Sequence, residues 1–401
     1  MMSKKVAIVG AGASGLLCAI LCAKKNLHVS LFEQNTKFAK KILVSGNGRC
    51  NITNTSFSSK DYYSQNPDFV AHSLKEFDFK EFESFINSIG LVLEEKNDGK
   101  MYPLSNEAKS VVSILHATAQ GLGVDFHMEN KISDIKKLFE AYDYVVIATG
   151  SEAAPHLGGS NDGHNFALEF GHTIIPSYAS LVQLELDSKY AHKMSGAKVE
   201  GEVTVLINKV HASRYFGDIL FTNYGISGFA ILDASQEISL ALMNDEAVNI
   251  SINLLPKYTA QKLSNYLSQS SQLQTALPLE NILHGLLPIK IVKALLEKLE
   301  LQANTQINTK LSKKIANQIL NWRFEVKDTH GFRHAEVAGG GVNVDEINPS
   351  SMESLKQKNL YFCGEVLDVL GRRGGFNFAW CWASANSVAQ DIIKKDILDR
   401  F

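Results

Sequence analysis

Three glycines near the start of the chain have the spacing of a phosphate-binding turn. They occur in Gly10-Ala-Gly12-Ala-Ser-Gly15, which lies between a β-branched run at residues 5–9 and an apolar stretch with helical periodicity. Glycines in this context allow a tight turn and the close approach of a pyrophosphate, while the helix N-terminus offers N–H groups to the phosphate oxygens. The segment therefore predicts a βαβ unit that binds a dinucleotide.

An acidic residue narrows the choice of dinucleotide. Glu33 lies 18 residues after Gly15, at the end of a second predicted strand over residues 27–33. Its carboxylate can accept hydrogen bonds from the adenosine ribose hydroxyls, and it repels a 2′-phosphate. The sequence therefore predicts FAD or NAD rather than NADP.

Two segments far along the chain favour FAD. Thr149-Gly150 ends the apolar strand "YDYVVIATG", and Gly364-Glu365 ends "NLYFCGE", just before "GRRGGFN" and a long predicted helix. A flavin needs polar groups along its ribityl chain and N–H donors near its pyrimidine edge. Glu365 is a candidate for the first role and the helix start at residues 374–377 for the second. Thr149-Gly150 considered alone is also compatible with an ordinary strand-ending turn.

The composition is that of a globular protein without a bulk charge. The 401 residues are 45 % hydrophobic and carry a formal net charge of −2, so no overall positive field indicates nucleic acid or a membrane surface. The apolar run from Leu16 to Ala23 is too short to span a bilayer. Five cysteines without a CxxC pair favour reduced thiols and a cytoplasmic location. The histidines lack metal-ligand spacing, so we predict no metal site.

The pattern of the chain predicts an α/β protein with an insertion. Alternating segments such as residues 198–207 and 247–255 read as antiparallel strands, whereas residues 257–320 are mostly helical. We expect a discontinuous Rossmann-type FAD-binding domain over residues 1–194 and 337–401. Residues 195–336 would form an inserted domain that is β-rich and barrel-like, with the helical part inside it.

Several stretches together resemble a known family. These are "VAIVGAGASGL", "KKILVSGNGRCNITN", "ILFTNYGISGFAIL", "INPSSMES" and "LYFCGEVLDVLGRRGGFNFAWCWASA", which are spread over almost the whole chain. They are similar to the BaiN-like family of bacterial FAD-dependent oxidoreductases, within the flavoprotein superfamily with two dinucleotide-binding folds. The resemblance implies an FAD domain made from both chain ends and an inserted β-barrel with helices.

The chain also departs from this family at a few positions. Ala39 stands where a glycine is usual, Asn223 where histidine is expected, and Phe229 where proline is expected. Arg372-Arg373 occupy positions that are usually acidic or small. The last of these differences concern the type of substrate rather than FAD binding.

The resemblance also explains the irregular stretch "SGNGRCNIT", residues 45–53. The superfamily wraps a loop around the FAD at this point, where glycines let N–H groups face the cofactor and Arg49 can offset phosphate charge. Disulfide reductases of the superfamily carry two cysteines here, but this chain has only Cys50, so we do not expect a dithiol mechanism. Buried packing is the favoured role of Cys50, and a reactive thiol is the alternative.

The candidate site residues fall into three groups. The predicted cofactor contacts are Gly10, Gly12, Ala13, Ser14, Gly15, Glu33, Lys40, Lys41, Gly46, Gly48, Arg49, Cys50, Asn51, Ile132, Thr149, Gly150, Gly364, Glu365, Gly374, Gly375, Phe376 and Asn377. Catalytic candidates are Cys50, Asn223 and Tyr224, the last two being equally compatible with an ordinary β-turn. Arg372 and Arg373 are candidates for an anionic substrate, with a solvated charge pair as the alternative.

The predicted function is that of an FAD-dependent oxidoreductase that transfers hydride between flavin and a small-molecule substrate not identified by the sequence. No second GxGxxG is visible, so NAD(P)H as reductant would dock transiently. Three alternatives stay open: reduction of ribosomal RNA uridine to dihydrouridine, an amine or amino-ketone oxidase, and a non-enzymatic flavin redox sensor. Fold alone does not choose among them, and the sequence leaves the oligomeric state open.

Overall fold

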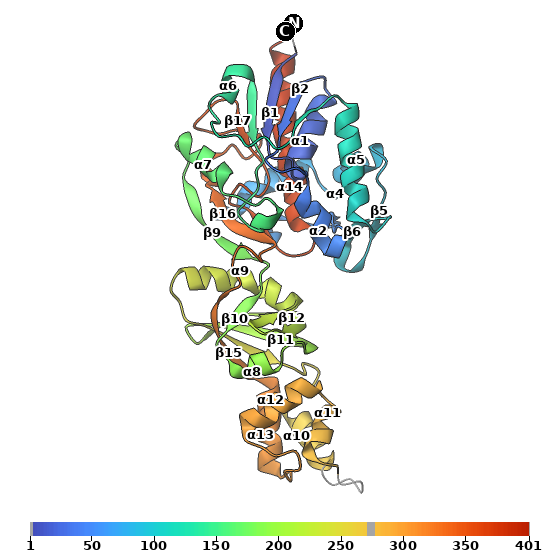
Figure 1. Ribbon diagram of the computed structural model, residues 1–401, viewed down its shortest axis with the longest axis vertical. Helices are drawn as coiled ribbons and strands as arrows, with labels where there is room; N and C mark the ends of the chain where they lie inside the picture. Colours follow the sequence, from blue (N-terminus) through green and yellow to red (C-terminus); the bar gives the residue numbers. More distant parts are fainter. Residues whose placement is uncertain (1–2, 271–276, 401) are drawn as a thin grey trace. The chain divides into compact units, whose positions relative to one another are not determined.

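The computed structural model describes residues 3–270 and 277–400, and the chain forms two compact units (Figure 1). Residues 1–177 and 337–401 make up the first unit, and residues 178–336 make up the second. The sequence assigns residues 178–194 to the first domain, whereas in the structure they lie with the second unit. The reason is that β10 (Leu184–Leu186) pairs with β13 (Gly225–Ser227) and β15 (Trp322–Thr329).

The first unit is built on a five-stranded parallel sheet. Its order is β17 (Leu360–Phe362), β8 (Tyr144–Ile147), β1 (Lys5–Val9), β2 (His28–Phe32) and β7 (Asp125–His127). β8 and β17 are buried along their whole length, as expected for parallel strands covered on both faces. The predicted Rossmann-type α/β fold is therefore confirmed.

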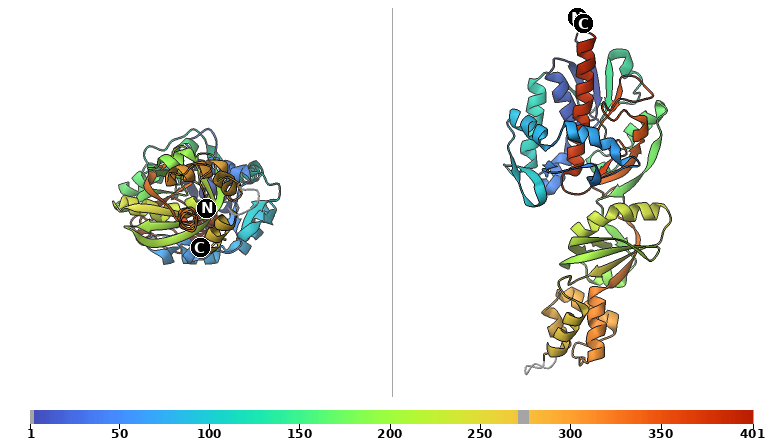
Figure 2. Two further views of the ribbon diagram at one scale, coloured as in Figure 1. Left: turned by 90° about the horizontal axis from the view of Figure 1, so that it is seen from below. Right: turned by 180° about the vertical axis from the view of Figure 1, so that it is seen from behind.

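The two ends of the chain meet in this unit. α1 (Ala13–Ala23) lies beside the long closing helix α14 (Phe376–Leu398), as both Figure 1 and Figure 2 show. α1 ends before Asn26, whose φ of 61° is left-handed. The remaining helices and strands of this unit are α2 (Lys40–Gly48), β3 (Thr53–Asn54), β4 (Tyr62–Tyr63), α3 (Ala71–Glu76), α4 (Phe79–Ser88), β5 (Leu93–Glu95), β6 (Lys100–Pro103), α5 (Ala108–Gly121), α6 (Leu138–Ala141), α7 (Asp162–Glu169), β16 (Val337–Val342) and β18 (Leu370–Gly371). β9 (Ile174–Ser180) begins in the first unit and ends in the second.

The second unit contains a closed barrel, as the resemblance implied. The strand order is β10, β13, β12 (Val210–Phe221), β11 (Lys198–Ile207), β14 (Val248–Asn253) and β15. Burial alternates along β14 and β15, because one face of each strand points to the barrel core. Asn208 and Lys209, both with positive φ, form the tight turn between β11 and β12.

Helices complete the second unit. α8 (Lys189–Lys193) precedes the barrel hairpin, and α9 (Phe229–Met243) packs against β11 and β12. The segment predicted to be helical contains α10 (Ala260–Ser270), α11 (Leu279–His284), α12 (Ile289–Leu299) and α13 (Thr309–Leu320). Their apolar side chains join the barrel residues in one core.

Within the described ranges, no helix is both long and apolar enough to cross a membrane. The same part of the chain holds no group of three or more His, Cys, Asp or Glu side chains arranged to bind a metal ion.

The central strand gives a direct test of the first unit's core. Ile8 is fully buried in β1, so Ile8→Ala should lower the free energy of unfolding of this unit by about 2–5 kcal/mol through lost burial and a cavity. Urea unfolding would measure the change. Leu104→Ala is the control, because Leu104 is 61 % exposed and its removal should cost within about 0.5 kcal/mol. Equal effects of the two changes would contradict the assignment of β1 to the core.

Candidate functional site

The glycine turn between β1 and α1 contains two kinds of glycine. Gly10 has a φ of 108°, and a Cβ on it would lie 2.4 Å from the Ala148 carbonyl oxygen. A Cβ on Gly15 would lie 1.9 Å from the Gly10 carbonyl oxygen. Gly12 differs, because no atom lies within 4 Å of a Cβ built there. Gly10 and Gly15 are thus required by packing, whereas Gly12 borders open space.

The N-terminus of α1 opens on the same space. Gly12 is its N-cap and no side chain makes a capping hydrogen bond to it, although Ala13 and Ser14 are buried. The first N–H groups of a helix need partners, and the positive end of the helix dipole favours an anion. A pyrophosphate is the kind of group that fits this N-terminus.

Glu33 is held in place at the end of β2 by neighbouring N–H groups. Its Oε2 accepts from the Ala11 backbone N–H (3.0 Å), and its Oε1 accepts from the backbone N–H (2.9 Å) and the side-chain amide (2.6 Å) of Asn35. A carboxylate offers about four acceptor positions, so one remains on Oε2 for a ribose hydroxyl. Sequence reasoning missed Ala11 and Asn35, although Asn35 follows the strand-ending acid by two residues.

The loop after β7 lies near Glu33. The Asn130 backbone N–H donates to the Glu33 carbonyl oxygen (2.9 Å), which anchors the loop that carries the half-buried Ile132. Lys40 faces the same region, since its Nζ donates to Asn35 Oδ1 (3.3 Å) and to the His156 carbonyl oxygen (3.1 Å).

The C-terminal segment reaches the first turn of α1. Ser14 Oγ donates to the Cys363 carbonyl oxygen (3.4 Å), and a Cβ on Gly364 would lie 2.6 Å from that hydroxyl. Gly364 has a φ of 78°, so both its backbone conformation and its surroundings select glycine. The structure therefore brings the predicted Gly364 and Ser14 together across almost the whole chain.

Glu365 joins three segments that the sequence predicted separately. Its Oε2 forms an ion pair with Lys41 Nζ (2.8 Å), and its Oε1 accepts from the Ala338 backbone N–H (3.0 Å). A Cβ on Gly150 would lie 3.9 Å from Oε2. The Thr149 hydroxyl beside it is buried without a hydrogen-bond partner among the described residues. Lys41 therefore neutralises Glu365, a pairing that spacing along the chain did not reveal.

Residues 45–50 have the irregular backbone that their composition predicts. Ser45 breaks the helical geometry of α2, and Gly46 and Asn47 both adopt left-handed conformations (φ 57° and 58°). Ala39, where the related family usually has glycine, is also left-handed (φ 54°) and so sits in a conformation that favours glycine.

Asn51 and Asn377 fix the backbone at the start of α14. The Asn51 side-chain amide is oriented so that its oxygen accepts from the Gly375 N–H (3.1 Å) and its nitrogen donates to the Thr53 carbonyl oxygen (3.0 Å). Asn377 accepts from the Gly371 N–H and donates to the Gly371 carbonyl oxygen, both at 2.8 Å. Since both side chains are engaged, contacts to a cofactor from this helix start would come from backbone N–H groups.

The arginines near the site are already engaged or exposed. Arg372 Nε lies 2.6 Å from Asp61 Oδ1, and its guanidinium covers the Phe376 ring at 4.2 Å. Arg372 therefore braces the segment before α14, which weakens its assignment to an anionic substrate. Arg49 is exposed and donates to the Gly46 carbonyl oxygen (3.2 Å). The substrate role of Arg373, next to Gly374, stays a prediction.

Cys50 is not suited to act as a nucleophile. The thiol is fully buried, and burial raises its pKa to about 12. A thiol with this pKa stays protonated near neutral pH, whereas the thiolate is the reactive form. Burial and this raised pKa favour the packing role of Cys50 over the reactive-thiol alternative.

The remaining catalytic candidates lie in the second unit. Asn223 and Tyr224 form the turn between β12 and β13, and the Tyr224 ring stacks on His330 with a centroid distance of 4.0 Å. Their role in lining a substrate cavity stays a prediction.

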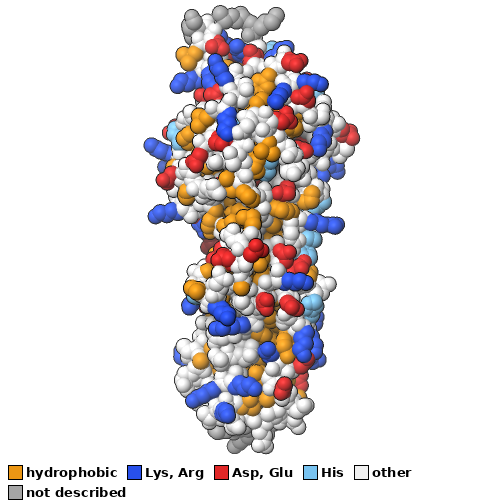
Figure 3. Space-filling view, turned by 90° about the vertical axis from the view of Figure 1, so that its left-hand side faces the viewer, with side chains coloured by type: hydrophobic (Ala, Val, Ile, Leu, Met, Phe, Trp, Pro, Cys, Tyr) orange, Lys and Arg blue, Asp and Glu red, His pale blue; other side chains and the backbone are white. Residues whose placement is uncertain are grey.

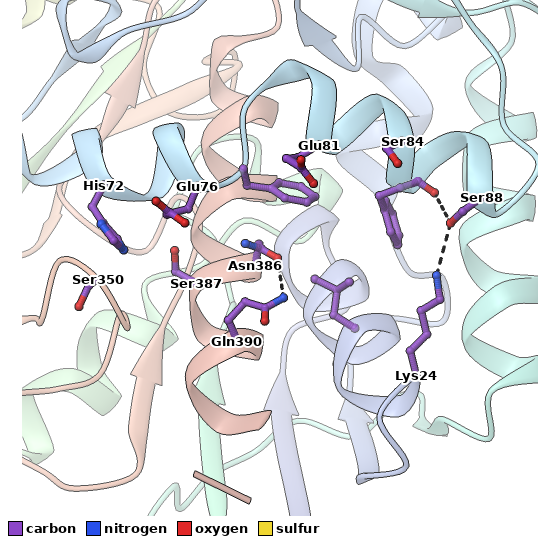
Figure 4. Close-up of a pocket in the computed structure, with 13 residues that line it drawn as sticks. Lys24, His72, Glu76, Glu81, Ser84, Ser88, Ser350, Asn386, Ser387 and Gln390 are labelled. Atoms are coloured by element: carbon purple, nitrogen blue, oxygen red, sulfur yellow. Dashed lines mark hydrogen bonds between the residues drawn. The ribbon is translucent and has the colours of Figure 1, made fainter. Parts of the chain in front are cut away.

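A separate polar groove of about 510 Å³ lies between α1, α3, α4 and α14 (Figure 4). It contains none of the predicted site residues. Its rim carries the exposed His72, Glu76 and Glu81, and Asn386 and Ser387 belong to its buried floor.

Comparison with known proteins decides the family. The family described as "HI0933-like protein Rossmann domain" matches residues 4–391. The chain belongs to this family. This match confirms the predicted resemblance to BaiN-like FAD-dependent oxidoreductases. The HI0933-like protein is therefore a flavoprotein oxidoreductase.

Similar proteins match this HI0933-like protein along nearly its whole length. The ribosomal RNA dihydrouridine synthase of Haemophilus influenzae is 34% identical, over 97% of this chain and 98% of the relative. The 3-dehydro-bile acid delta(4,6)-reductase of Clostridium scindens is 29% identical, over 95% and 97%. A solved 3-ketosteroid delta1-dehydrogenase from Sterolibacterium denitrificans superposes with a TM-score of 0.47 at 10% identity, covering 98% of this chain and all of the other.

Gly12 offers a test that separates cofactor binding from folding. Because a Cβ there meets no protein atom, Gly12→Ala should leave the secondary structure and the stability of the apoprotein unchanged. The added methyl would instead obstruct a pyrophosphate, so the Kd for FAD should rise at least about tenfold, or about 1.4 kcal/mol. Fluorescence titration of the apoprotein with FAD would measure it. Gly121→Ala, at the end of α5 and equally open, should keep FAD affinity. Unchanged affinity in both variants would place the pyrophosphate elsewhere.

Cys50 offers a second test. Cys50→Ala should lower the free energy of unfolding by about 1–2 kcal/mol through lost packing. The rate of flavin reduction and its pH profile between about pH 6 and 9 should not change, because a thiol with a pKa of about 12 does not titrate there. Stopped-flow absorbance would record both. Loss of a titration step in the variant would show that Cys50 reacts after all.

Proposed function

We propose that this HI0933-like protein is an FAD-dependent reductase of a carbon–carbon double bond conjugated to a carbonyl group. Two relatives that match the whole chain support this substrate class. One is named for a delta(4,6) reduction of a 3-dehydro-bile acid, and the other for the formation of dihydrouridine. In a 3-oxo-Δ4 steroid and in uracil alike, the reduced double bond is conjugated to a carbonyl. The shared chemistry is hydride addition to the far carbon of this system, followed by protonation of the near carbon.

The residues of the first unit have distinct roles in this proposal. Bound FAD, when reduced, supplies the hydride. The N-terminus of α1 would hold the pyrophosphate, and Glu33 would accept from the adenosine ribose. Lys41 would hold the Glu365 carboxylate in place beside the strand ends, where it can accept from ribityl hydroxyls. The backbone N–H groups at the start of α14, fixed by Asn51, would serve the pyrimidine edge.

The reductant in this proposal is NAD(P)H. The sequence carries one GxGxxG, which the FAD is expected to occupy, so NAD(P)H would dock transiently. NAD(P)H would supply hydride to the flavin and leave as NAD(P)⁺ before the unsaturated substrate binds.

A second substrate, uridine in ribosomal RNA, is supported by one observation. The relative named for that reaction shares 34% identity over 97% of the chain, compared with 29% for the bile-acid reductase. Both substrates belong to the same chemical class and differ in how they are recognised.

Anaerobic reduction tests the proposal. NADH or NADPH should bleach the flavin absorption band of the purified protein. A 3-oxo-Δ4,6 steroid or uridine-containing ribosomal RNA should then restore it, because the conjugated alkene accepts the hydride. Absorbance spectroscopy follows both steps, and mass spectrometry should show a gain of two hydrogens in the substrate. A saturated 3-oxo steroid is the control and should not reoxidise the flavin.

Two results would contradict the proposal. If the flavin stays oxidised with either nicotinamide but simple amines bleach it and release peroxide in air, the protein is an oxidase. If no electron donor bleaches it, the flavin serves as a sensor rather than a catalyst.

A further inference from the structure

The formal charge of this chain is unevenly distributed. We call residues 257–320, which include α10–α13, the helical module. The helical module contains eight lysines and three glutamates, with no arginine or aspartate, and so carries +5. Since the whole chain carries −2, the remaining residues carry −7. A strong local positive charge is therefore concealed by the overall value.

The lysines of the helical module are available to a partner. All eight are exposed, and none forms an ion pair with an acid in the described ranges, although Lys290 donates to the Ser195 carbonyl oxygen and Lys298 lies over the Tyr190 ring. The acids of the helical module do not neutralise them. Glu297 pairs with Lys189 and Lys193 outside the helical module, and Glu280 lies 3.7 Å from His284. Figure 3 shows blue (Lys or Arg) side chains on the surface of the segment that Figure 1 labels α10–α13, which contains no arginine.

Three of these lysines lie on one helix. Lys310, Lys313 and Lys314 are three and four residues apart on α13, so their charges are neighbours on the helix surface. Like charges at this spacing destabilise a helix, and α13 contains no acid to offset them. α10, which contains Lys262, packs against α13, and Ser264 Oγ lies 3.0 Å from Ser312 Oγ. Lys310 and Lys314 are each two residues from Ser312, so they project from the side of α13 that faces away from α10.

Two exposed aromatic rings lie beside other lysines of the helical module, Lys257 and Lys262. Tyr258, next to Lys257, and Tyr266 on α10 are each 38% exposed. Aromatic rings between cationic side chains suit single-stranded nucleic acid, because bases stack on the rings while the cations contact phosphates. A membrane surface fits less well. Most apolar residues of these helices, such as Leu263, Leu295 and Ile315, are fully buried, and Ile289 (58% exposed) on α12 is a single exposed apolar side chain rather than a broad apolar face that could enter lipid.

We propose that the helical module binds RNA, with the lysines of α13 contacting the phosphate backbone and with Tyr258 and Tyr266, beside Lys257 and Lys262, stacking on bases. The inference rests on the second substrate of the proposed function, for which it supplies the means of recognition. It concerns a surface far in sequence from the FAD motifs, so binding and flavin chemistry can be measured separately.

The test uses the full-length, FAD-loaded protein and a matched pair of triple variants. Lys310→Gln, Lys313→Gln and Lys314→Gln are combined in one, and Lys75→Gln, Lys80→Gln and Lys109→Gln in the control, which removes the same charge from exposed helix positions of the first unit. Fluorescence anisotropy with a uridine-rich RNA of about 20 nucleotides is recorded between about 50 and 200 mM salt. The α13 variant should bind at least tenfold more weakly, with a salt slope lower by about 2, while the control changes less than twofold.

The outcomes separate this inference from the proposed function. Wild-type protein whose flavin is bleached by NADPH but which does not bind RNA at low salt would overturn the RNA surface and leave the reductase intact. If both triple variants lost RNA affinity equally, the loss would reflect the change in overall charge rather than a specific surface, and the inference would also be overturned. Stronger binding to phosphatidylserine vesicles than to RNA would assign the surface to membranes instead. Retained flavin bleaching with selective loss of RNA affinity in the α13 variant supports the inference.

Discussion

The contact between Gly15 and the carbonyl of Gly10 is the constraint on which the candidate site depends. With a would-be Cβ only 1.9 Å from that oxygen, α1 can begin this close to β1 only if the residue is glycine. This closeness aims the N-terminus of α1 at the space beside Gly12, where no protein atom would meet a Cβ. A helix start without a side-chain cap is stabilised by an anion, so this N-terminus suits a phosphate group.

The second feature is that both chain ends build this site. The C-terminal Gly364 lies against Ser14, and Glu365 pairs with Lys41, 324 residues earlier in the sequence. Strand β17 joins the sheet beside β8, so the sheet is complete only when the C-terminal segment has docked. The inserted second unit therefore has its own barrel and core, while the residues expected to bind FAD belong to the first unit.

Positive and negative charges are concentrated in different parts of the chain, which the net charge of −2 does not show. The helical module carries a positive formal charge, and the rest of the chain carries a negative one. Apolar side chains of the helices in this module pack in the core of the second unit. Long-range attraction of a polyanion depends on such local fields more than on the total charge.

The sequence by itself determined the local features of this protein. The glycine turn, the flanking strands of β-branched residues, the alternating barrel strands and the amphipathic helices of residues 257–320 are set by neighbours within a few residues, and the patterns predicted them. The irregular backbone at residues 45–50 follows from glycine and asparagine for the same reason. The family resemblance extended this to the fold class.

Tertiary structure decided the rest, because the relevant groups meet only when distant segments pack. The ion pair of Arg372 with Asp61, the placement of Gly375 by Asn51 and the position of residues 178–194 in the barrel unit depend on the path of the whole chain. The pKa of Cys50 depends on burial, which no local pattern reports. Sequence therefore specified which residues could bind a dinucleotide, and packing decided which of their side chains remain available to do so.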